Sequence, residues 1–407
     1  MTTIENPTAR RLTAAAATTH RAHLALLGPL PAVPAAQLIA MASAAGLTGR
    51  GGAAFPVGRK LAAVQAGGRG VVVANGAEGE PASSKDRALL TQAPHLVLDG
   101  LDLAARAVGA TSAYLYAPRD LLDGRLAGAL RERRDDVAVR TVEAVDTFVS
   151  GQSSAAVAAI NGLRPVPTTA PPSVHQRGVD GRPTLVQNVE TLAQLALLAR
   201  YGPEWFRGLG TSDEPGTRLL TLSGAVRSPG VYEVAGGTTL GSVLELAGGA
   251  SIPVQALLVG GYHGGWVPWN PATADLPHSR AALTPYGADP GAGVVVALGS
   301  DRCGLRAGAD IAAYLAGQSA GQCGPCVNGL PAVADHLARL AAGRTAPSAV
   351  RELRRVVGLV EGRGACHHPD GTARLVRSTL LTFAAEVELH VAGRCSAAVS
   401  SFRTGRR

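Results

Sequence analysis

The sequence predicts a parallel α/β domain followed by a small α+β module and a helical C-terminal region. Three observations predict this order. Short β-branched and aromatic runs alternate with helical patterns in residues 34–144, which is typical of a parallel sheet. Residues 217–249 read as two short strands, a tight SPG turn and one helix. From about residue 303 onward helical patterns dominate.

The elements of the α/β domain follow from apolar periodicity and from glycine and proline at their ends. The helix that begins at Pro34 ends at Gly46, a residue type that commonly stops a helix. Expected helices and strands alternate over 34–46 (helix), 70–76 (strand), 94–110 (helix), 112–118 (strand), 120–134 (helix) and 137–144 (strand). A long Pro-, Thr- and Gly-rich loop is expected over residues 165–183.

Composition restricts the class of protein. The 407 residues are 46% hydrophobic and only 17% charged, which indicates a globular chain of two or three domains. The longest uncharged runs contain proline and glycine, so no membrane span is predicted. Residues 1–33 are basic but lack an apolar h-region, which favours a tail or helix over a targeting peptide. Five cysteines without a secretory signal indicate a reducing, cytoplasmic compartment.

Charge usage argues against nucleic acid as a ligand. The formal net charge is +8, but the arginines are scattered and form no patch interleaved with aromatic residues. Only two of the 38 basic residues are lysines, Lys60 and Lys85. In a chain that uses arginine almost everywhere, a lysine indicates a position that needs a compact point charge.

Both lysines fall in segments that suggest a ligand site. GLTGRGGAAFPVGRK, residues 46–60, is a glycine-rich loop whose backbone N–H groups could approach a phosphate or a flat ring, with Arg50 and Lys60 adding positive charge. It matches neither the Walker pattern nor G-x-G-x-x-G, and a plain turn is the alternative.

The second lysine lies just after a predicted strand. ANGAEGEPASSKDR, residues 74–87, places Asn75, Glu78, Glu80 and Lys85 at the carboxyl end of the strand, where open α/β sheets bind ligands. A solvated charged loop is the alternative interpretation.

The cysteines indicate metal ligation more than disulfide chemistry. CGPC at residues 323–326 has the spacing of a thioredoxin-type pair, but it lies late in the chain, in a helical region, and follows Gly321 and Gln322 rather than tryptophan. A C-x-x-C pair with Cys366 forty residues away is closer to cluster or zinc ligation. Cys395 is expected to be a structural or incidental thiol.

Several segments together carry a specific resemblance. In their order along the chain, from about residue 28 to 390, they are similar to the FMN-binding, NADH-oxidising subunit of respiratory complex I (F-subunit type) and its relatives in NAD-linked hydrogenases and formate dehydrogenases. The segments are GLTGRGGAAFPVGRK, NGAEGEPASSKDRALLTQAPHLVLDG, GRPTLVQNVETLA, SGAVRSPGVYEVAGGTTL, and GQCGPC followed by Cys366.

The resemblance implies a domain order and a set of cofactors. Residues 1–33 would be an N-terminal tail or helix, 34–210 an α/β flavin-binding domain that also binds NADH, 216–300 a β-grasp module of the soluble-ligand-binding (SLBB) type, and 301–407 a C-terminal helical bundle with a [4Fe-4S] cluster. Hydride would pass from NAD(H) to FMN, and single electrons from FMN to the cluster. The protein would position and tune these groups and supply no catalytic side chain of its own.

The resemblance also assigns site residues by motif. The loop from Gly49 to Phe55 would cradle FMN, and Glu80 with Phe55 would lie on the nicotinamide side. The cofactor-binding residues implied are Gly49, Arg50, Gly51, Gly52, Phe55, Lys60, Asn75, Glu78, Glu80, Gly151, Gln187 and Asn188. The cluster ligands implied are Cys323, Cys326 and Cys366.

The sequence departs from the family pattern at these sites. Ala320 replaces the first cysteine of C-G-x-C-x-x-C, leaving Cys303, His367 or His368 as a fourth ligand, a three-iron cluster, or no cluster. GQSS at residues 151–154 replaces G-E-E-T and removes two carboxylates. Ala54, Ala77 and Gln187 replace a glycine, an acid and an asparagine of the family pattern. These changes indicate a diverged relative.

The function expected is therefore an electron-transfer oxidoreductase that passes electrons from NADH through FMN and iron–sulfur to a ferredoxin-like or other iron–sulfur partner. The basic surface would suit an acidic partner, and a membrane would be involved only through a partner complex. One alternative is a flavoprotein fed by ferredoxin, and another is a non-catalytic scaffold with degenerate cofactor sites. A thioredoxin-like reductase is the last alternative.

Overall fold

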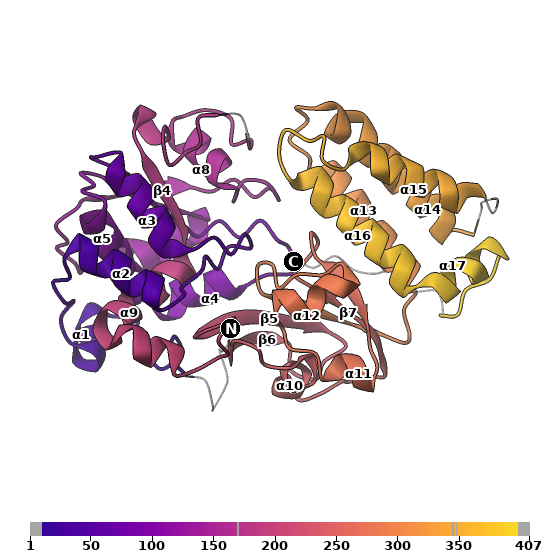
Figure 1. Cartoon of the computed structure of the whole chain (residues 1–407), viewed down its shortest axis with the longest axis horizontal. Coiled ribbons are helices and arrows are strands. Elements are labelled where there is room, and N and C mark those ends of the chain that lie inside the picture. The colour runs from indigo at the N-terminus through magenta and orange to yellow at the C-terminus, as the bar shows by residue number, and fades with distance from the viewer. Residues whose placement is uncertain (1–9, 169–170, 344–345, 347, 398–407) are drawn as a thin grey trace. The chain divides into compact units, whose positions relative to one another are not determined.

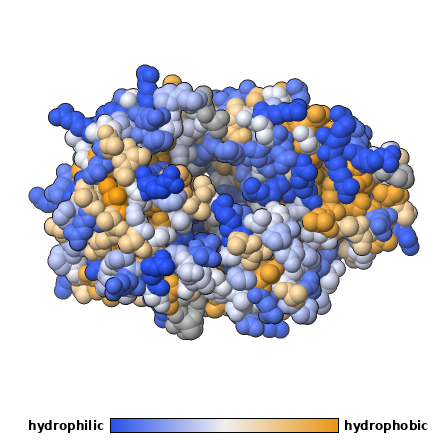
Figure 2. Space-filling model, in the orientation of Figure 1, coloured by the Kyte–Doolittle hydropathy of each residue, from blue (hydrophilic) through white to orange (hydrophobic). Residues whose placement is uncertain are grey.

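The computed structural model describes residues 10–168, 171–343, 346 and 348–397 (Figure 1). The first nine residues of the expected N-terminal tail lie outside these ranges. The chain divides into two compact units, the first formed by residues up to 79, 84–220 and 231–237, and the second by 80–83, 221–230 and 238 onward. None of the described helices is long and apolar enough to cross a membrane. The face drawn in Figure 2 mixes hydrophilic and hydrophobic residues.

A four-stranded parallel sheet organises the first unit. The strands are β1 (Val71–Asn75), β2 (Ala113–Ala117), β3 (Val139–Glu143) and β4 (Thr184–Asn188), in the order β3-β2-β1-β4. All neighbouring pairs are parallel, so the parallel sheet expected from the alternating pattern is confirmed. The pattern did not predict β4, which pairs with β1.

Helices cover both faces of this sheet. The predicted helices over 34–46, 94–110 and 120–134 are confirmed, whereas α3, α4, α8 and α9 were not predicted. The helices of the first unit are α1 (His20–Leu27), α2 (Ala35–Ala44), α3 (Val57–Ala66), α4 (Lys85–Gln92), α5 (Pro94–Ala107), α6 (Arg119–Leu121), a π turn (Leu122–Leu126), α7 (Ala127–Arg131), α8 (Ser153–Ile160), a 3-10 turn (Val179–Gly181) and α9 (Val189–Arg207).

The close approach of α5 and α9 fixes the larger core of this unit. A Cβ on Gly100 would lie 1.9 Å from the backbone carbonyl oxygen of Leu192, so only glycine permits this crossing. On the sheet, Val72 and Leu115 face this core, whereas Val73 and Tyr114 face a smaller core on the opposite side. This alternation is the period of two expected for strands that are buried on both faces.

A buried carboxylate ties three helices of this unit together. Asp99 on α5 accepts hydrogen bonds from His23 on α1 (2.7 Å) and Arg200 on α9 (2.6 Å), and it pairs with Arg133 after α7 (2.7 Å). Burial alone would raise the pKa of this carboxyl, but the hydrogen bond from His23 and the charge of Arg133 lower it to about 2.

A mixed five-stranded sheet follows. Its strands are β5 (Thr217–Gly224), β6 (Gly230–Ala235), β7 (Val254–Val259), β8 (Gly265–Pro268) and β9 (Val294–Gly299), in the order β6-β5-β9-β7-β8. β5 runs parallel to β9, and β7 runs antiparallel to both β8 and β9. The two strands and the helix expected over 217–249 are confirmed as β5, β6 and α10 (Leu240–Leu246). The short helices α11 (Pro271–Ala274) and α12 (Arg280–Leu283) and a 3-10 turn (Thr284–Tyr286) precede β9.

The C-terminal part of the second unit is helical, as expected. Its helices are α13 (Gly304–Gly317), a π turn (Pro325–Gly329), α14 (Leu330–Ala341), α15 (Ser348–Val360), α16 (His368–Thr382) and α17 (Ala384–Val391), of which α13 to α16 lie side by side in Figure 1. Two glycines of α13 allow close packing, because Cβ atoms on Gly304 and Gly308 would lie 2.2 Å from the Phe383 ring and 2.5 Å from Thr379.

The Asp99 network predicts an acid-sensitive stability. Because the folded-state pKa of about 2 lies below the ordinary aspartate value, the ionised group stabilises the fold above about pH 4, and this contribution is lost as the pH falls toward 2. We measure the free energy of unfolding by urea denaturation followed by circular dichroism. Between pH 4 and pH 2 we expect this free energy to fall by about 2 kcal/mol less in Asp99→Asn than in the unsubstituted chain. The exposed Asp213→Asn is the control, and equal declines in all three proteins would contradict the assignment.

Candidate functional site

Two neighbouring parallel strands end in asparagines. Asn75, the last residue of β1, is paired in register with Asn188, the last residue of β4. The Asn75 amide donates to the carbonyl oxygen of Gly151 (2.7 Å), and the Asn188 side chain accepts the backbone N–H of Glu190 (3.0 Å), which caps α9. The structure therefore brings Asn75, Gly151 and Asn188 together at the carboxyl edge of the sheet.

The glycine-rich loop folds over the end of β4. Its two ends are joined by the Gly49 N–H to Phe55 carbonyl hydrogen bond (2.9 Å). A Cβ on Gly51 would stand 3.4 Å from the Asn188 Cβ, and Gly52 has φ +107°, a conformation that other residues rarely adopt. Ala54 also has a positive φ, of 50°. The loop thus presents backbone rather than side chains beside Asn188.

Arg50 points into the protein instead of lining the loop. Its guanidinium is buried and donates to the carbonyl oxygens of Thr217 (3.1 Å) and Pro215 (3.4 Å), while its backbone N–H bonds Thr191 (2.9 Å). Burial lowers the pKa of Arg50 to about 10. The side chain and the backbone N–H of Arg50 therefore anchor the loop to the protein.

Lys60 and Gln187 form a pair near the end of β4. The Lys60 ammonium donates to the Val186 carbonyl and to the Gln187 amide oxygen (3.3 Å). Burial lowers the pKa of Lys60 to about 8. The Gln187 amide nitrogen is buried and has no hydrogen-bond partner among the described residues. A buried donor without a partner costs free energy, so this nitrogen is suited to a bound ligand.

Lys85, the second lysine, is the centre of a buried charge network. Its ammonium lies 2.7 Å from Asp86, 2.8 Å from Glu190 and 3.3 Å from the Asn188 side chain. Burial alone would lower the pKa of Lys85, but the two carboxylates raise it. Burial raises the pKa of Asp86 to about 6, although Lys85 opposes this effect. The sequence analysis did not single out Glu190. Only the structure shows that Glu190, buried in the first turn of α9, pairs with Lys85.

Glu78 and Glu80 are each engaged by backbone N–H groups. Glu78 accepts the N–H groups of Asp86 and Arg87, both at 3.1 Å, at the start of α4. Glu80 accepts the N–H of Tyr262 (2.8 Å) within the second unit. Phe55 is half exposed, and the Arg59 guanidinium lies 5.7 Å from the centre of its ring.

The three cysteines of the expected cluster lie at two helix starts. Cys323 and Cys326 flank the start of the π turn before α14, and Cys366 precedes α16. All five cysteines are free thiols. Burial raises the pKa of Cys326 to about 12. Burial would also raise the pKa of the less buried Cys323, but the backbone N–H groups of Ala365 and Cys326 outweigh it and lower that pKa. Ala320 is buried and offers no donor side chain at the position of the missing cysteine.

The candidates for a fourth ligand differ in their surroundings. His368 is buried and uses both ring nitrogens, one toward the Leu315 carbonyl (2.8 Å) and one toward His263 (3.0 Å). Cys303 instead lies with Glu386, His390 and Cys395. His367 is exposed and contacts Asp370 at 3.3 Å. Of the three candidates, His367 is the one whose side chain faces solvent.

Comparison with known proteins assigns the main parts of the chain to family models. Residues 42–197 match the model of the Nuo51 FMN-binding domain, residues 219–261 the SLBB domain, and residues 306–390 the NADH-ubiquinone oxidoreductase-F iron-sulfur binding region. These matches define a class of proteins that combine an FMN-binding domain with an iron–sulfur region.

Individual relatives narrow this class. The F 2 subunit of NADH-quinone oxidoreductase from Rhizobium meliloti (strain 1021) is 30% identical over 378 residues, covering 88% of this chain and 89% of the relative. The NADP-reducing hydrogenase subunit HndC of Solidesulfovibrio fructosivorans is 29% identical, covering 88% and 76%. The chain belongs to the family of NADH-quinone oxidoreductase F subunits, so the family expected from the sequence motifs is confirmed.

A solved structure shows the same fold. A chain of the NAD⁺-reducing [NiFe]-hydrogenase in its H₂-reduced state superposes with a TM-score of 0.82 at 30% identity, covering 88% of the present chain. The present chain spans 63% of the length of that hydrogenase chain.

The charge network predicts a large effect of removing Lys85. Lys85→Met leaves the buried carboxylates of Asp86 and Glu190 without their cation, and we expect a loss of about 3–5 kcal/mol of unfolding free energy, measured by urea denaturation. The double variant Lys85→Met/Glu190→Gln should lose less. Arg87→Met, on the same helix, removes a surface pair with Asp120 and should cost less than about 1 kcal/mol. Equal losses in the two single variants would contradict the network.

Proposed function

We propose that this chain oxidises NADH and passes the electrons, through FMN and an iron–sulfur cluster, to a partner iron–sulfur protein. The observation that carries the proposal is the Gln187 amide nitrogen, which is buried without a partner among the described residues, beside Lys60 and near the end of β4 where the glycine-rich loop lies. A planar, polar cofactor meets both needs, because it accepts hydrogen bonds and requires close approach of backbone. Family membership supports FMN as that cofactor.

In this proposal the residues of the first unit bind and orient FMN. Gly49, Gly51 and Gly52 supply a backbone surface without side chains, while Lys60 and Gln187 supply donors. The chemistry that bound FMN would supply there is acceptance of a hydride and release of single electrons. The chain contributes position and electrostatics, with Asn75 and Asn188 held rigidly by the sheet and the Lys85 network.

From the family motifs, we propose that Phe55 and Glu80 each contact the nicotinamide nucleotide. The half-exposed Phe55 ring offers a flat apolar surface, and Glu80 supplies a carboxylate whose position is fixed by the Tyr262 N–H. GQSS leaves no carboxylate at residues 151–154, and the Gln152 amide oxygen is buried without a partner among the residues described. NADH would therefore be held with less negative charge than the family pattern provides.

The cluster would be held by Cys323, Cys326 and Cys366. Their donor chemistry fits iron–sulfur binding, because thiolates are the usual protein ligands of such clusters. Ala320 leaves the fourth position without a thiol, so a [4Fe-4S] cluster would take His367 or a non-protein ligand there. A three-iron cluster fits the same three thiols.

We propose that the cofactors are bound by separate domains, with the domain boundaries expected from the sequence. Residues 34–210 would bind FMN and NADH, the β-grasp module at 216–300 would join them to the remainder, and the helical bundle at 301–407 would hold the cluster. Residues 1–33, which include α1, would take no part in the chemistry.

The partner would be an acidic, ferredoxin-like protein or another iron–sulfur protein, and the complex would be cytoplasmic, with any membrane contact made by the partner. The net charge of +8 supports this choice.

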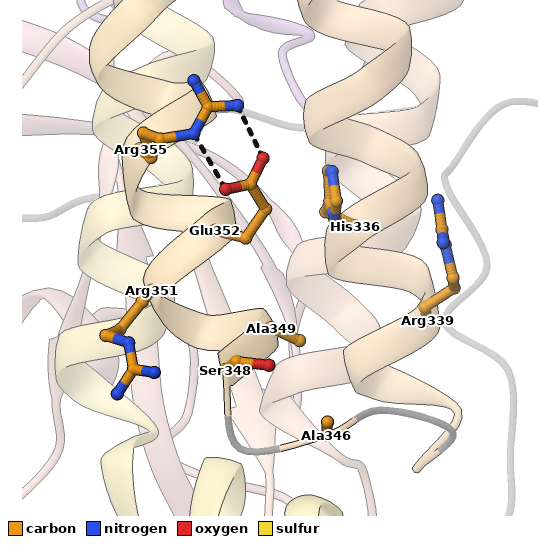
Figure 3. Close-up of a pocket in the computed structure, with 8 residues that line it drawn as sticks. All are labelled: His336, Arg339, Ala346, Ser348, Ala349, Arg351, Glu352 and Arg355. Carbon is orange, nitrogen blue, oxygen red and sulfur yellow. Dashed lines mark hydrogen bonds and ion pairs between the residues drawn. The ribbon is translucent and has the colours of Figure 1, made fainter.

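A pocket of about 600 Å³ lies between α14 and α15 (Figure 3). It contributes only a modest positive field, because Arg339 and Arg355 are already paired with Asp335 and Glu352. The residues lining it are His336, Arg339, Ala346, Ser348, Ala349, Arg351, Glu352 and Arg355.

A non-catalytic scaffold is the second candidate function. Ala320 and the GQSS segment favour it, because each removes a polar group from a cofactor site while the surrounding fold is kept. A scaffold would fold without flavin or iron. A flavoprotein fed by ferredoxin would keep FMN but ignore NADH.

The central test is anaerobic reduction of the reconstituted chain. With FMN, iron and sulfide restored, NADH should bleach the flavin absorption, and an iron–sulfur signal should then appear in electron paramagnetic resonance. Cys366→Ser should keep flavin bleaching and lose the iron–sulfur signal, because the cluster site alone is broken. If NADH cannot reduce the flavin but reduced ferredoxin can, then ferredoxin would replace NADH as the electron donor. A chain that binds neither cofactor would establish the scaffold.

Lys60 offers a separate test of the flavin site. Lys60→Met should weaken FMN binding by about 10- to 100-fold in fluorescence-quenching titrations, because a charged donor is lost. Since the pKa of Lys60 is about 8, FMN affinity of the unsubstituted chain should fall as the pH rises above 8, and this fall should vanish in the variant. Arg131→Met, an exposed cation on α7, serves as the control. Unchanged affinity in Lys60→Met would remove Lys60 from the site.

A further inference from the structure

Four potential metal ligands gather in the helical part of the second unit. Cys303 lies at the N-terminal cap of α13, Glu386 and His390 lie one turn apart on α17, and Cys395 follows that helix. One donor atom from each residue lies within 4.8 Å of the donor atoms of the other three. This set shares no residue with Cys323, Cys326 and Cys366.

The spacing of the donor atoms is close to that of a tetrahedral zinc site. The Cys303 Sγ lies 3.4 Å from the His390 Nε2 and 3.7 Å from the Glu386 Oε1, and these nitrogen and oxygen atoms lie 3.0 Å apart. Zinc bonds of about 2.3 Å to sulfur and about 2.0–2.2 Å to nitrogen or oxygen give tetrahedron edges of about 3.3–3.8 Å. These three donors therefore already lie near tetrahedral spacing, and the Cys395 sulfur, within 4.8 Å of each of them, would move inward to complete the site.

The surroundings hold these donors in place. Cys303, Glu386 and His390 are buried, next to apolar side chains that include Val387 and Leu305. The Glu386 carboxylate is oriented by Ser396, whose backbone N–H donates to Oε1 (3.0 Å) and whose hydroxyl donates to Oε2. Such outer contacts are typical of metal-binding carboxylates.

We propose that Cys303, Glu386, His390 and Cys395 form a mononuclear zinc site distinct from the iron–sulfur ligands. Two thiolates and an imidazole select a borderline-soft ion such as Zn²⁺ over Mg²⁺ or Ca²⁺. Because all four positions are filled by protein, the site is structural rather than catalytic, and it fastens the segment after α17 to the start of α13. Zinc binding releases the thiol protons to solvent. The proposal does not depend on the function proposed above.

Metal analysis of single variants separates the zinc site from the cluster. In the full chain, purified anaerobically and freed of loose metal, we expect about one zinc per chain by mass spectrometry, since structural zinc sites bind tightly. Cys395→Ser should lose the zinc and keep the iron, whereas Cys366→Ser should lose the iron and keep the zinc. Loss of iron in Cys303→Ser would instead make Cys303 a cluster ligand and overturn the proposal.

Two further measurements do not depend on the folding of a buried cysteine variant. Cobalt(II) added to the zinc-depleted chain should give thiolate-to-cobalt charge-transfer absorption, which Cys395→Ser should abolish and Cys323→Ser should retain. Ser396→Ala should weaken zinc binding by about 10- to 100-fold, because it removes an outer contact of Glu386. A zinc-free chain without this cobalt absorption, or a Cys303–Cys395 disulfide in peptides mapped without reduction, would overturn the proposal.

Discussion

The carboxyl edge of the first sheet depends on the ion pairs that the buried Lys85 ammonium makes with Asp86 and Glu190. This ammonium joins the start of α4, through Asp86, to the start of α9, through Glu190 and the Asn188 side chain. Because Asn188 ends β4 and is paired with Asn75 of β1, the network fixes the loops that leave both strands. Burying a cation and two carboxylates costs desolvation free energy, and separating them would leave buried charges without partners. The network therefore stabilises one arrangement of these loops. The glycine-rich loop then rests on a rigid platform.

The sequence predicted the elements whose patterns are local. The β-branched runs indicated β1, β2 and β3, and glycine and proline marked the ends of α2 and α5. β4 was missed because its sequence, TLVQN, is short, ends in two polar residues and follows a proline-rich loop. α3 was missed because Gly58 interrupts the pattern. A Cβ there would lie 2.1 Å from the Ser43 Oγ, so packing against α2 rather than helix propensity selects glycine.

The sequence also located most of the candidate site without revealing its contacts. The motifs placed Asn75, Gly151, Gln187 and Asn188 in one site, and the structure brings them to one edge of the sheet, because parallel strands end on the same side. They did not show that Arg50 turns into the protein, or that Cys303 lies with His390. Both outcomes depend on contacts between residues far apart in the chain, which spacing alone does not encode.

The carboxylates at the carboxyl edge of the first sheet are bound by groups of the protein itself. Glu78 accepts two N–H groups at the start of α4, while Asp86 and Glu190 neutralise Lys85. With alanine at position 77 and GQSS at 151–154, Glu80 is the one further acid in residues 74–87 and 151–154, and it accepts the Tyr262 N–H. The positive charge of Lys60, in contrast, is met by a carbonyl and an amide oxygen and by no carboxylate among the described residues. An edge with this balance favours an anionic ligand, which is why divergence of the acidic positions is compatible with retention of a phosphate-bearing cofactor.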